Sequence, residues 1–86
     1  MTYDIVWDEA AIDAAARFLG HDPEGVRQLM DSVDLLADQP RPEGSAPYAS
    51  PDLRRTHVGR YRVMYEITET AEATGTIVVL HVGRLG

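Results

Sequence analysis

This 86-residue sequence contains no cysteine, no lysine and no long run of apolar residues. Without cysteine the chain forms no disulfide bridge and no thiolate metal site. No apolar stretch approaches the ~18 residues that cross a membrane as a helix. The first residues, Met1 to Asp4, also lack the basic region and the apolar stretch of a signal peptide. We therefore expect a cytoplasmic protein that does not span a membrane.

Because lysine is absent, arginine supplies all eight basic side chains. Arginine keeps its charge at any physiological pH and grips phosphate with two parallel hydrogen bonds, but it is a poor general base. The net charge of −6 argues against a protein that coats nucleic acid without specificity. The charge is unevenly spread, however: residues 1–52 carry three arginines and eleven acids, whereas residues 53–86 carry five arginines and three acids. A basic surface is therefore expected in the second part.

Hydrophobic residues form 44% and charged residues 26% of the sequence, a balance typical of a globular protein. A chain of this length supports one hydrophobic core, so residues 1–86 are expected to form a single domain. No internal repeat or low-complexity segment is visible in it.

The first part of the chain predicts one strand followed by two helices. Residues 3–7 are rich in β-formers, and Asp8 is a typical N-cap for a helix over residues 8–19. Asp22 and Pro23 begin a second helix, which ends before Pro40. Each helix has an apolar stripe to bury: Ala11, Ala15, Phe18 and Leu19 in the first, and Val26, Leu29, Met30, Val33, Leu36 and Ala37 in the second.

The second part of the chain predicts three strands. An irregular connection over residues 40–52 is followed by strands over residues 53–58, 60–67 and 75–82, with a turn at Gly59 and a polar hairpin loop over residues 68–74. The middle strand alternates, with one face made of Tyr61, Val63, Tyr65 and Ile67. The predicted fold class is therefore α+β with the order β-α-α-β-β-β, a helical hairpin packed on one face of a small, mainly antiparallel sheet.

The sheet face away from the helices is the candidate functional surface. Arg55 and His57 share one side of their strand, and Arg60 and Arg62 share one side of the next. Pairing in register would gather these cations, and phosphate is the natural partner of several arginines. The alternative is that exposed strands carry arginine only for solubility and edge protection. Composition alone leaves both interpretations open.

The three histidines differ in their expected surroundings. His21 lies in the turn between the helices, where we expect it to be solvated. His57 lies beside the arginines, where it could exchange a proton at neutral pH. His81 shares the alternation of Ile77 and Val79 and is expected to be packed near the end of its strand. The spacing of the histidines fits no compact metal motif, so no metal or cofactor is expected.

Three segments together resemble the RelE/ParE superfamily of bacterial type II toxins. They are LLADQPRP over residues 35–42, LRRTHVGRYRVMYEI over residues 53–67, and VVLHVGR over residues 78–84. The resemblance to RelE implies a toxin that cuts mRNA on the ribosome without a metal. In such an enzyme the 2′-hydroxyl of the substrate attacks the adjacent phosphate. The resemblance to RelE also implies three partners, which are a RelB-like antitoxin, the ribosome and mRNA.

The resemblance also implies roles for individual residues. Arg62 occupies the position of the arginine that stabilises the phosphate. Arg55 occupies a basic position that helps to activate the nucleophile or to hold the backbone, and Arg84 lies close to a basic position near the C-terminus. The expected catalytic residues are Arg62, Arg55 and Arg84, with His57 and His81 as further acid–base candidates, and the expected RNA-binding residues are Arg54 and Arg60.

Two departures from the family keep an alternative open. The sequence ends at Arg84-Leu85-Gly86 and lacks the tail that carries a tyrosine in the family, and its net charge is acidic although these toxins are usually basic. The alternative is a ParE-like toxin that inhibits DNA gyrase without cutting RNA, or a toxin-fold protein that mainly binds its antitoxin.

Overall fold

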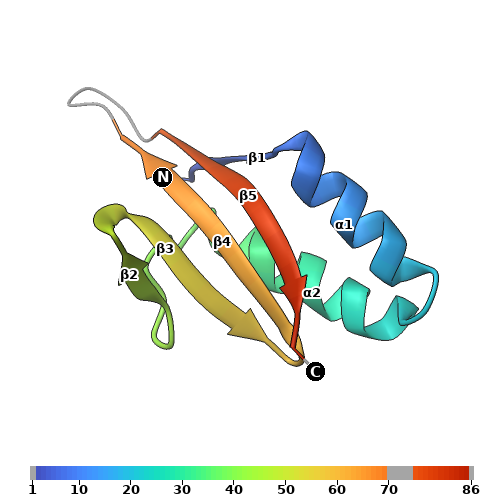
Figure 1. Cartoon of the computed structure of the whole chain (residues 1–86). Helices are drawn as coiled ribbons and strands as arrows, with labels where there is room; N and C mark the ends of the chain where they lie inside the picture. Colours follow the sequence, from blue (N-terminus) through green and yellow to red (C-terminus); the bar gives the residue numbers. More distant parts are fainter. Residues whose placement is uncertain (1, 70–74, 86) are drawn as a thin grey trace.

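The computed structural model describes residues 2–69 and 75–85. Its elements, in chain order, are β1 (Asp4–Trp7), α1 (Glu9–Leu19), α2 (Pro23–Leu35), β2 (Ala46–Tyr48), β3 (Ser50–Val58), β4 (Tyr61–Thr68) and β5 (Thr76–Arg84). The strands form one sheet in the order β1-β5-β4-β3-β2, and both helices lie on one of its faces (Figure 1). β1 and β5 run parallel, and the other neighbouring strands are antiparallel. The predicted α+β fold is confirmed.

Both helices begin at the predicted residues. The Asp8 carboxylate accepts a hydrogen bond from the backbone N–H of Glu9 at 2.8 Å, and the Asp22 carboxylate accepts one from Gly25 at 3.1 Å. These contacts satisfy N–H groups that lack a partner in the first turn of a helix. In the described part of the chain, neither helix is long and apolar enough to cross a membrane.

The core lies between the helical hairpin and the sheet. The predicted alternation of β4 is confirmed, because its inward residues are each at most 3% exposed: Tyr61, Val63, Tyr65 and Ile67. They pack against buried residues of α2: Val26, Leu29 and Val33. Two residues of the predicted helical stripes are exposed instead, Leu19 by 51% and Met30 by 43%. Both line a groove between the two helices, and they therefore do not face the sheet.

The prediction of an irregular connection over residues 40–52 was wrong in its second half. β2 forms there and pairs with β3, which begins at Ser50 instead of Leu53. Pro47 is compatible with a strand because β2 is at the edge of the sheet, where a missing N–H need not break the ladder. Ala49 makes the tight turn between the two strands with a φ of 67°, a left-handed conformation that is costly for a residue with a Cβ.

At the other end of the sheet, β4 continues through Thr68, and β5 begins at Thr76 and runs to Arg84. The predicted hairpin loop over residues 68–74 therefore starts one residue later than expected. Residues 70–74 of that prediction lie outside the described residues.

Candidate functional site

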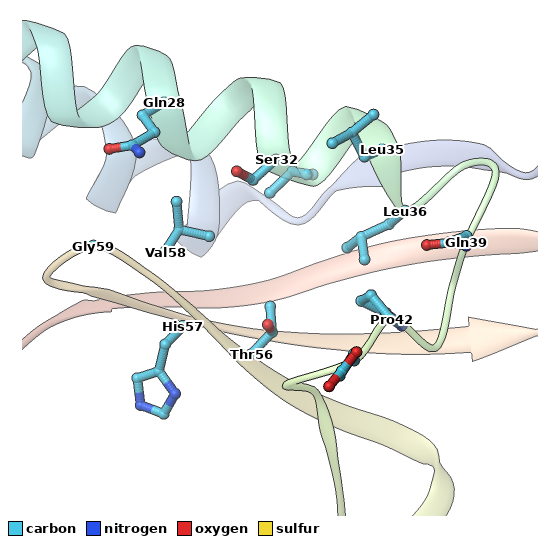
Figure 2. Close-up of a pocket in the computed structure, with 12 residues that line it drawn as sticks. Gln28, Ser32, Leu35, Leu36, Gln39, Pro42, Thr56, His57, Val58 and Gly59 are labelled. Carbon is cyan, nitrogen blue, oxygen red and sulfur yellow. The ribbon is translucent and has the colours of Figure 1, made fainter.

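Arg62, in β4, lies on the open face of the sheet, by which we mean the side away from the helices. Its direct neighbours across the strands are His57 on β3 and Gly83 on β5. Directly opposite residues of antiparallel strands share a face, with Cα atoms about 4.5–5.5 Å apart. Figure 2 shows the imidazole of His57 pointing away from α2. The structure thus brings His57 and Arg62 together on one surface.

His81 also lies on the open face, although simple alternation along β5 predicts otherwise. Met64 pairs with His81, but the next residue, Tyr65, pairs with Val79, so Leu80 is an extra residue in β5. Such a β-bulge shifts the side-chain alternation beyond it. His81 is consequently exposed, and the buried residues of β5 are Ile77, Val79 and Val82. The prediction of a packed His81 was wrong for this reason.

Arg55 completes the group on the open face. It lies directly opposite Met64, which lies opposite His81 on its other side. Arg55 is also two residues from His57 along β3, a distance of about 7 Å. We call the four residues Arg55, His57, Arg62 and His81 the open-face cluster.

Gly83 provides the space beside the ring of His81. A Cβ built on Gly83 would lie 3.3 Å from Nε2 of His81, which is tighter than an ordinary van der Waals contact. Gly83 is directly opposite Arg62, and the ring of His81 lies beside Gly83. The two imidazoles therefore flank Arg62, one from β3 and the other from β5.

The arginines of the open-face cluster are not neutralised by neighbouring carboxylates. Among the described residues, both ion pairs are made by Arg41, with Asp52 at 3.4 Å and with Glu69 at 3.0 Å. Within the same residues, the guanidinium groups of Arg55 and Arg62 form no ion pair. Two nearby guanidinium groups that form no ion pair in the described part of the chain favour the binding of an anion, and phosphate accepts two hydrogen bonds from each.

Arg54 lies on the opposite face from the cluster, because it pairs with the inward-facing Tyr65. Its guanidinium donates hydrogen bonds to Oγ of Ser45 at 2.9 and 3.2 Å and to the carbonyl oxygen of Ser45 at 3.2 Å. The structure therefore uses Arg54 to hold the segment that precedes β2.

Arg60 and Arg84 lie at the end of the sheet, away from Arg55. Arg60 belongs to the turn between β3 and β4, and Arg84 pairs with Tyr61. Both line a hollow of about 300 Å³ to which Asp22 and Tyr61 also contribute. The structure therefore brings neither arginine into the open-face cluster.

In that hollow, a pair of hydrogen bonds ties the start of α2 to β4. The hydroxyl of Tyr61 donates to Oδ2 of Asp22 at 2.8 Å, and the backbone N–H of Gly25 donates to Oδ1 at 3.1 Å. These two bonds hold the pKa of Asp22 below its usual value. Burial, followed by the hydrogen bond to Asp22, raises the pKa of Tyr61.

The Asp22 carboxylate should make folding stability depend on pH on the acid side. Because the pKa of Asp22 is lower in the folded chain than in the unfolded chain, its contribution is present above the unfolded pKa of about 4 and is lost as the pH falls through the folded pKa. In Asp22→Asn this dependence should disappear while the N-cap is kept, since asparagine also caps helices. Thermal unfolding of both proteins between about pH 2 and pH 7 tests this. Parallel curves would contradict it.

Tyr48 was missed as a candidate because β2 was not predicted. Its ring centroid lies 5.5 Å from Cζ of Arg55, beside the open-face cluster. The only signal in the sequence is an aromatic β-former between Pro47 and Pro51, and prolines normally indicate a loop.

Two hollows lie away from the open face. One, of about 390 Å³, lies between α2 and β3, and Figure 2 shows Gln28 and Ser32 of α2 facing Val58 across it. The other is an apolar groove of about 450 Å³ on the helical hairpin, lined by Trp7, Ile12, Ala15, Ala16, Leu19, Val26 and Met30. We call the second one the hairpin groove.

A comparison of the sequence with protein-family models shows the family of this chain. The family model described as the ParE toxin of the type II toxin-antitoxin system parDE matches residues 5–85. The chain therefore belongs to this family and is a toxin of the RelE/ParE type, as its resemblance implied. No curated protein matches the sequence significantly.

Solved structures of such toxins share the fold along nearly the whole chain. The RelE–RelB complex from the archaeon Pyrococcus horikoshii is similar with a TM-score of 0.76 and 22% identity, over 100% of this chain and 98% of that one. A mutant of the E. coli toxin RelE in the free state has a TM-score of 0.72 and 26% identity, over 98% and 84%. The chromosomal ParDE system of P. aeruginosa has a TM-score of 0.76 and 12% identity, over 99% and 98%.

Proposed function

We propose that this toxin is a metal-independent endoribonuclease that cuts mRNA on the ribosome and so stops translation and growth. The observation that carries the proposal is the arrangement around Arg62, with His57 and His81 on its two sides. Arginine for charge and two imidazoles for proton transfer are the groups that phosphodiester cleavage through the 2′-hydroxyl requires. The RelE–RelB and RelE structures support the same activity by family.

In this proposal the reaction divides among the residues of the open-face cluster. One imidazole takes the proton of the 2′-hydroxyl as its oxygen attacks the phosphorus, and Arg62 neutralises the charge that develops on the phosphorane oxygens. The other imidazole protonates the departing 5′-oxygen. The products are a 2′,3′-cyclic phosphate and a 5′-hydroxyl. Arg55, about 7 Å along β3 from His57, holds a neighbouring phosphate.

The partner in this proposal is a cognate antitoxin of the RelB type. Relatives of similar fold are found with their antitoxins, RelB in one case and DinJ in another. The hairpin groove is a suitable surface for apolar side chains of such a partner, because Ile12, Leu19 and Met30 are each more than 40% exposed there. Local acids of the antitoxin would meet the arginines of the open face.

A second candidate is a ParE-like toxin that binds DNA gyrase and cuts no RNA. The match to the ParE family model over residues 5–85 favours it, as does the net charge of −6. An acidic protein gains little affinity for RNA from counterion release. The two candidates differ in what they do to RNA, so one experiment separates them.

That experiment is induced expression of the toxin in a bacterial host, with mapping of mRNA 5′ ends by primer extension. The nuclease predicts growth arrest together with new cuts within reading frames, and 5′-hydroxyl ends at those cuts. Growth arrest without new cuts, accompanied by inhibited gyrase supercoiling, would identify the second candidate. Neither arrest nor cuts would contradict both.

A further inference from the structure

Tyr48 is the aromatic side chain that is left available to a ligand. All six aromatic residues lie in the described part of the chain, and the other five are buried or partly buried. The hydroxyls of Tyr61 and Tyr65 are engaged by Asp22 and by the carbonyl oxygen of Pro40. Tyr48, in contrast, is 47% exposed at the edge of the sheet.

The backbone of the short strand that carries Tyr48 is held on both sides. The following residue, Ala49, adopts a left-handed conformation, and this tight turn makes Tyr48 pair with Ser50. On the other side of β2, Ser45 is held by the guanidinium of Arg54. A three-residue edge strand fixed at both ends loses little further backbone entropy when its aromatic residue contacts a ligand.

The ring of Tyr48 is positioned against the open-face cluster. Its centroid lies 5.5 Å from Cζ of Arg55, within the range of a cation–π contact. Arg55 is two residues from His57 along β3, and His57 is directly opposite Arg62. The ring therefore lies on the same face of the sheet as Arg62, with Arg55 between the two.

We propose that Tyr48, backed by Arg55, is a stacking platform for one unpaired base of the RNA next to the scissile phosphate. Single-stranded RNA is recognised largely by stacking of exposed bases on tyrosine and arginine planes. Each such stack contributes roughly 5- to 150-fold in affinity. The net charge of −6 limits the electrostatic affinity of the chain for RNA, and stacking on Tyr48 would add affinity that does not depend on charge. The inference rests on the proposed ribonuclease function.

The test combines a side-chain change with the removal of a base. Purified wild-type toxin, Tyr48→Phe and Tyr48→Ala cut defined mRNA on ribosomes, with an abasic nucleotide placed in turn at each position of the exposed codon. Tyr48→Ala should cut the intact mRNA at least about 5-fold more slowly, and Tyr48→Phe should remain within about 2-fold of wild type, because phenylalanine keeps the ring. Leu35→Ala, at an exposed position of α2 with no role in either proposed surface, is the control for handling and folding.

The base that stacks on Tyr48 is identified where the effects of Tyr48→Ala and of the abasic nucleotide do not add. At one position the abasic nucleotide should slow the wild type but not slow Tyr48→Ala further, because both changes remove the same contact. Additive effects at all positions would overturn the platform, as would a Tyr48→Phe variant as slow as Tyr48→Ala. A Tyr48→Ala variant that cuts normally but no longer binds the antitoxin would assign Tyr48 to that partner instead. If the wild type does not cut at all, it is the proposed ribonuclease function that fails.

Discussion

Replacing Arg62 with alanine is expected to slow mRNA cleavage by roughly 10²- to 10³-fold and to abolish growth arrest. Arg62 lies at the centre of the open-face cluster, and its guanidinium forms no ion pair among the described residues. Its removal therefore takes away positive charge from the open face without breaking an ion pair within the part of the chain that the structure describes. The rate of cutting on programmed ribosomes, measured beside growth curves, gives the size of the effect.

Two further variants make the Arg62 experiment specific. Arg62→Lys keeps the positive charge but loses the planar fork, so an intermediate rate is expected. Arg27→Ala removes an exposed arginine from α2, on the other face of the sheet, and should cut like the wild type. If Arg62→Ala still cuts at the rate of the wild type, the open face is not the catalytic surface. If Arg27→Ala is as slow as Arg62→Ala, net charge and not position determines the rate.

Replacing Leu29 with alanine is expected to lower the free energy of unfolding by about 2–5 kcal/mol. Leu29 is 0% exposed and lies in the core, where α2 packs against the sheet. A domain of this size has a total stability of roughly 4–13 kcal/mol, so the loss is a large part of it. Urea unfolding followed by circular dichroism, in the Arg62→Ala background to avoid toxicity, measures the change.

The same helix offers a matched control for Leu29. Leu35 is 67% exposed, and Leu35→Ala should change the stability by no more than about 0.5 kcal/mol. The two variants remove the same atoms from the same helix, so the difference between them reports burial alone. Equal losses would mean that α2 does not pack through Leu29 as described.

Most of the fold was predictable because its signals are local. Asp8 and Asp22 cap helices by contacts with residues one and three positions away. The alternation of Tyr61 and Val63 records which side of β4 meets the core. Such patterns depend on neighbours in the sequence, so a single chain is sufficient to recognise them.

The candidate site was predicted only in part because its geometry depends on pairing between strands. His57 and Arg62 were placed correctly on one face, since both strands alternate regularly there. His81 was not, because the extra residue Leu80 is recognised only from the pairing of β5 with β4. Tyr48 was missed for a related reason: an edge strand accepts proline, so its sequence resembles a loop.

The parallel pairing of β1 with β5 joins the first strand of the sheet to its last. As the chain is synthesised, β1 has no partner until β5 has been made, and the apolar faces of α1 and α2 have little sheet to cover. Folding through such distant contacts is slow compared with folding through local ones. The open-face cluster requires β3, β4 and β5 side by side, so it is assembled only after β5, the final strand, has paired with β4. A chain that has not yet made β5 therefore lacks the assembled surface on which the proposed chemistry depends.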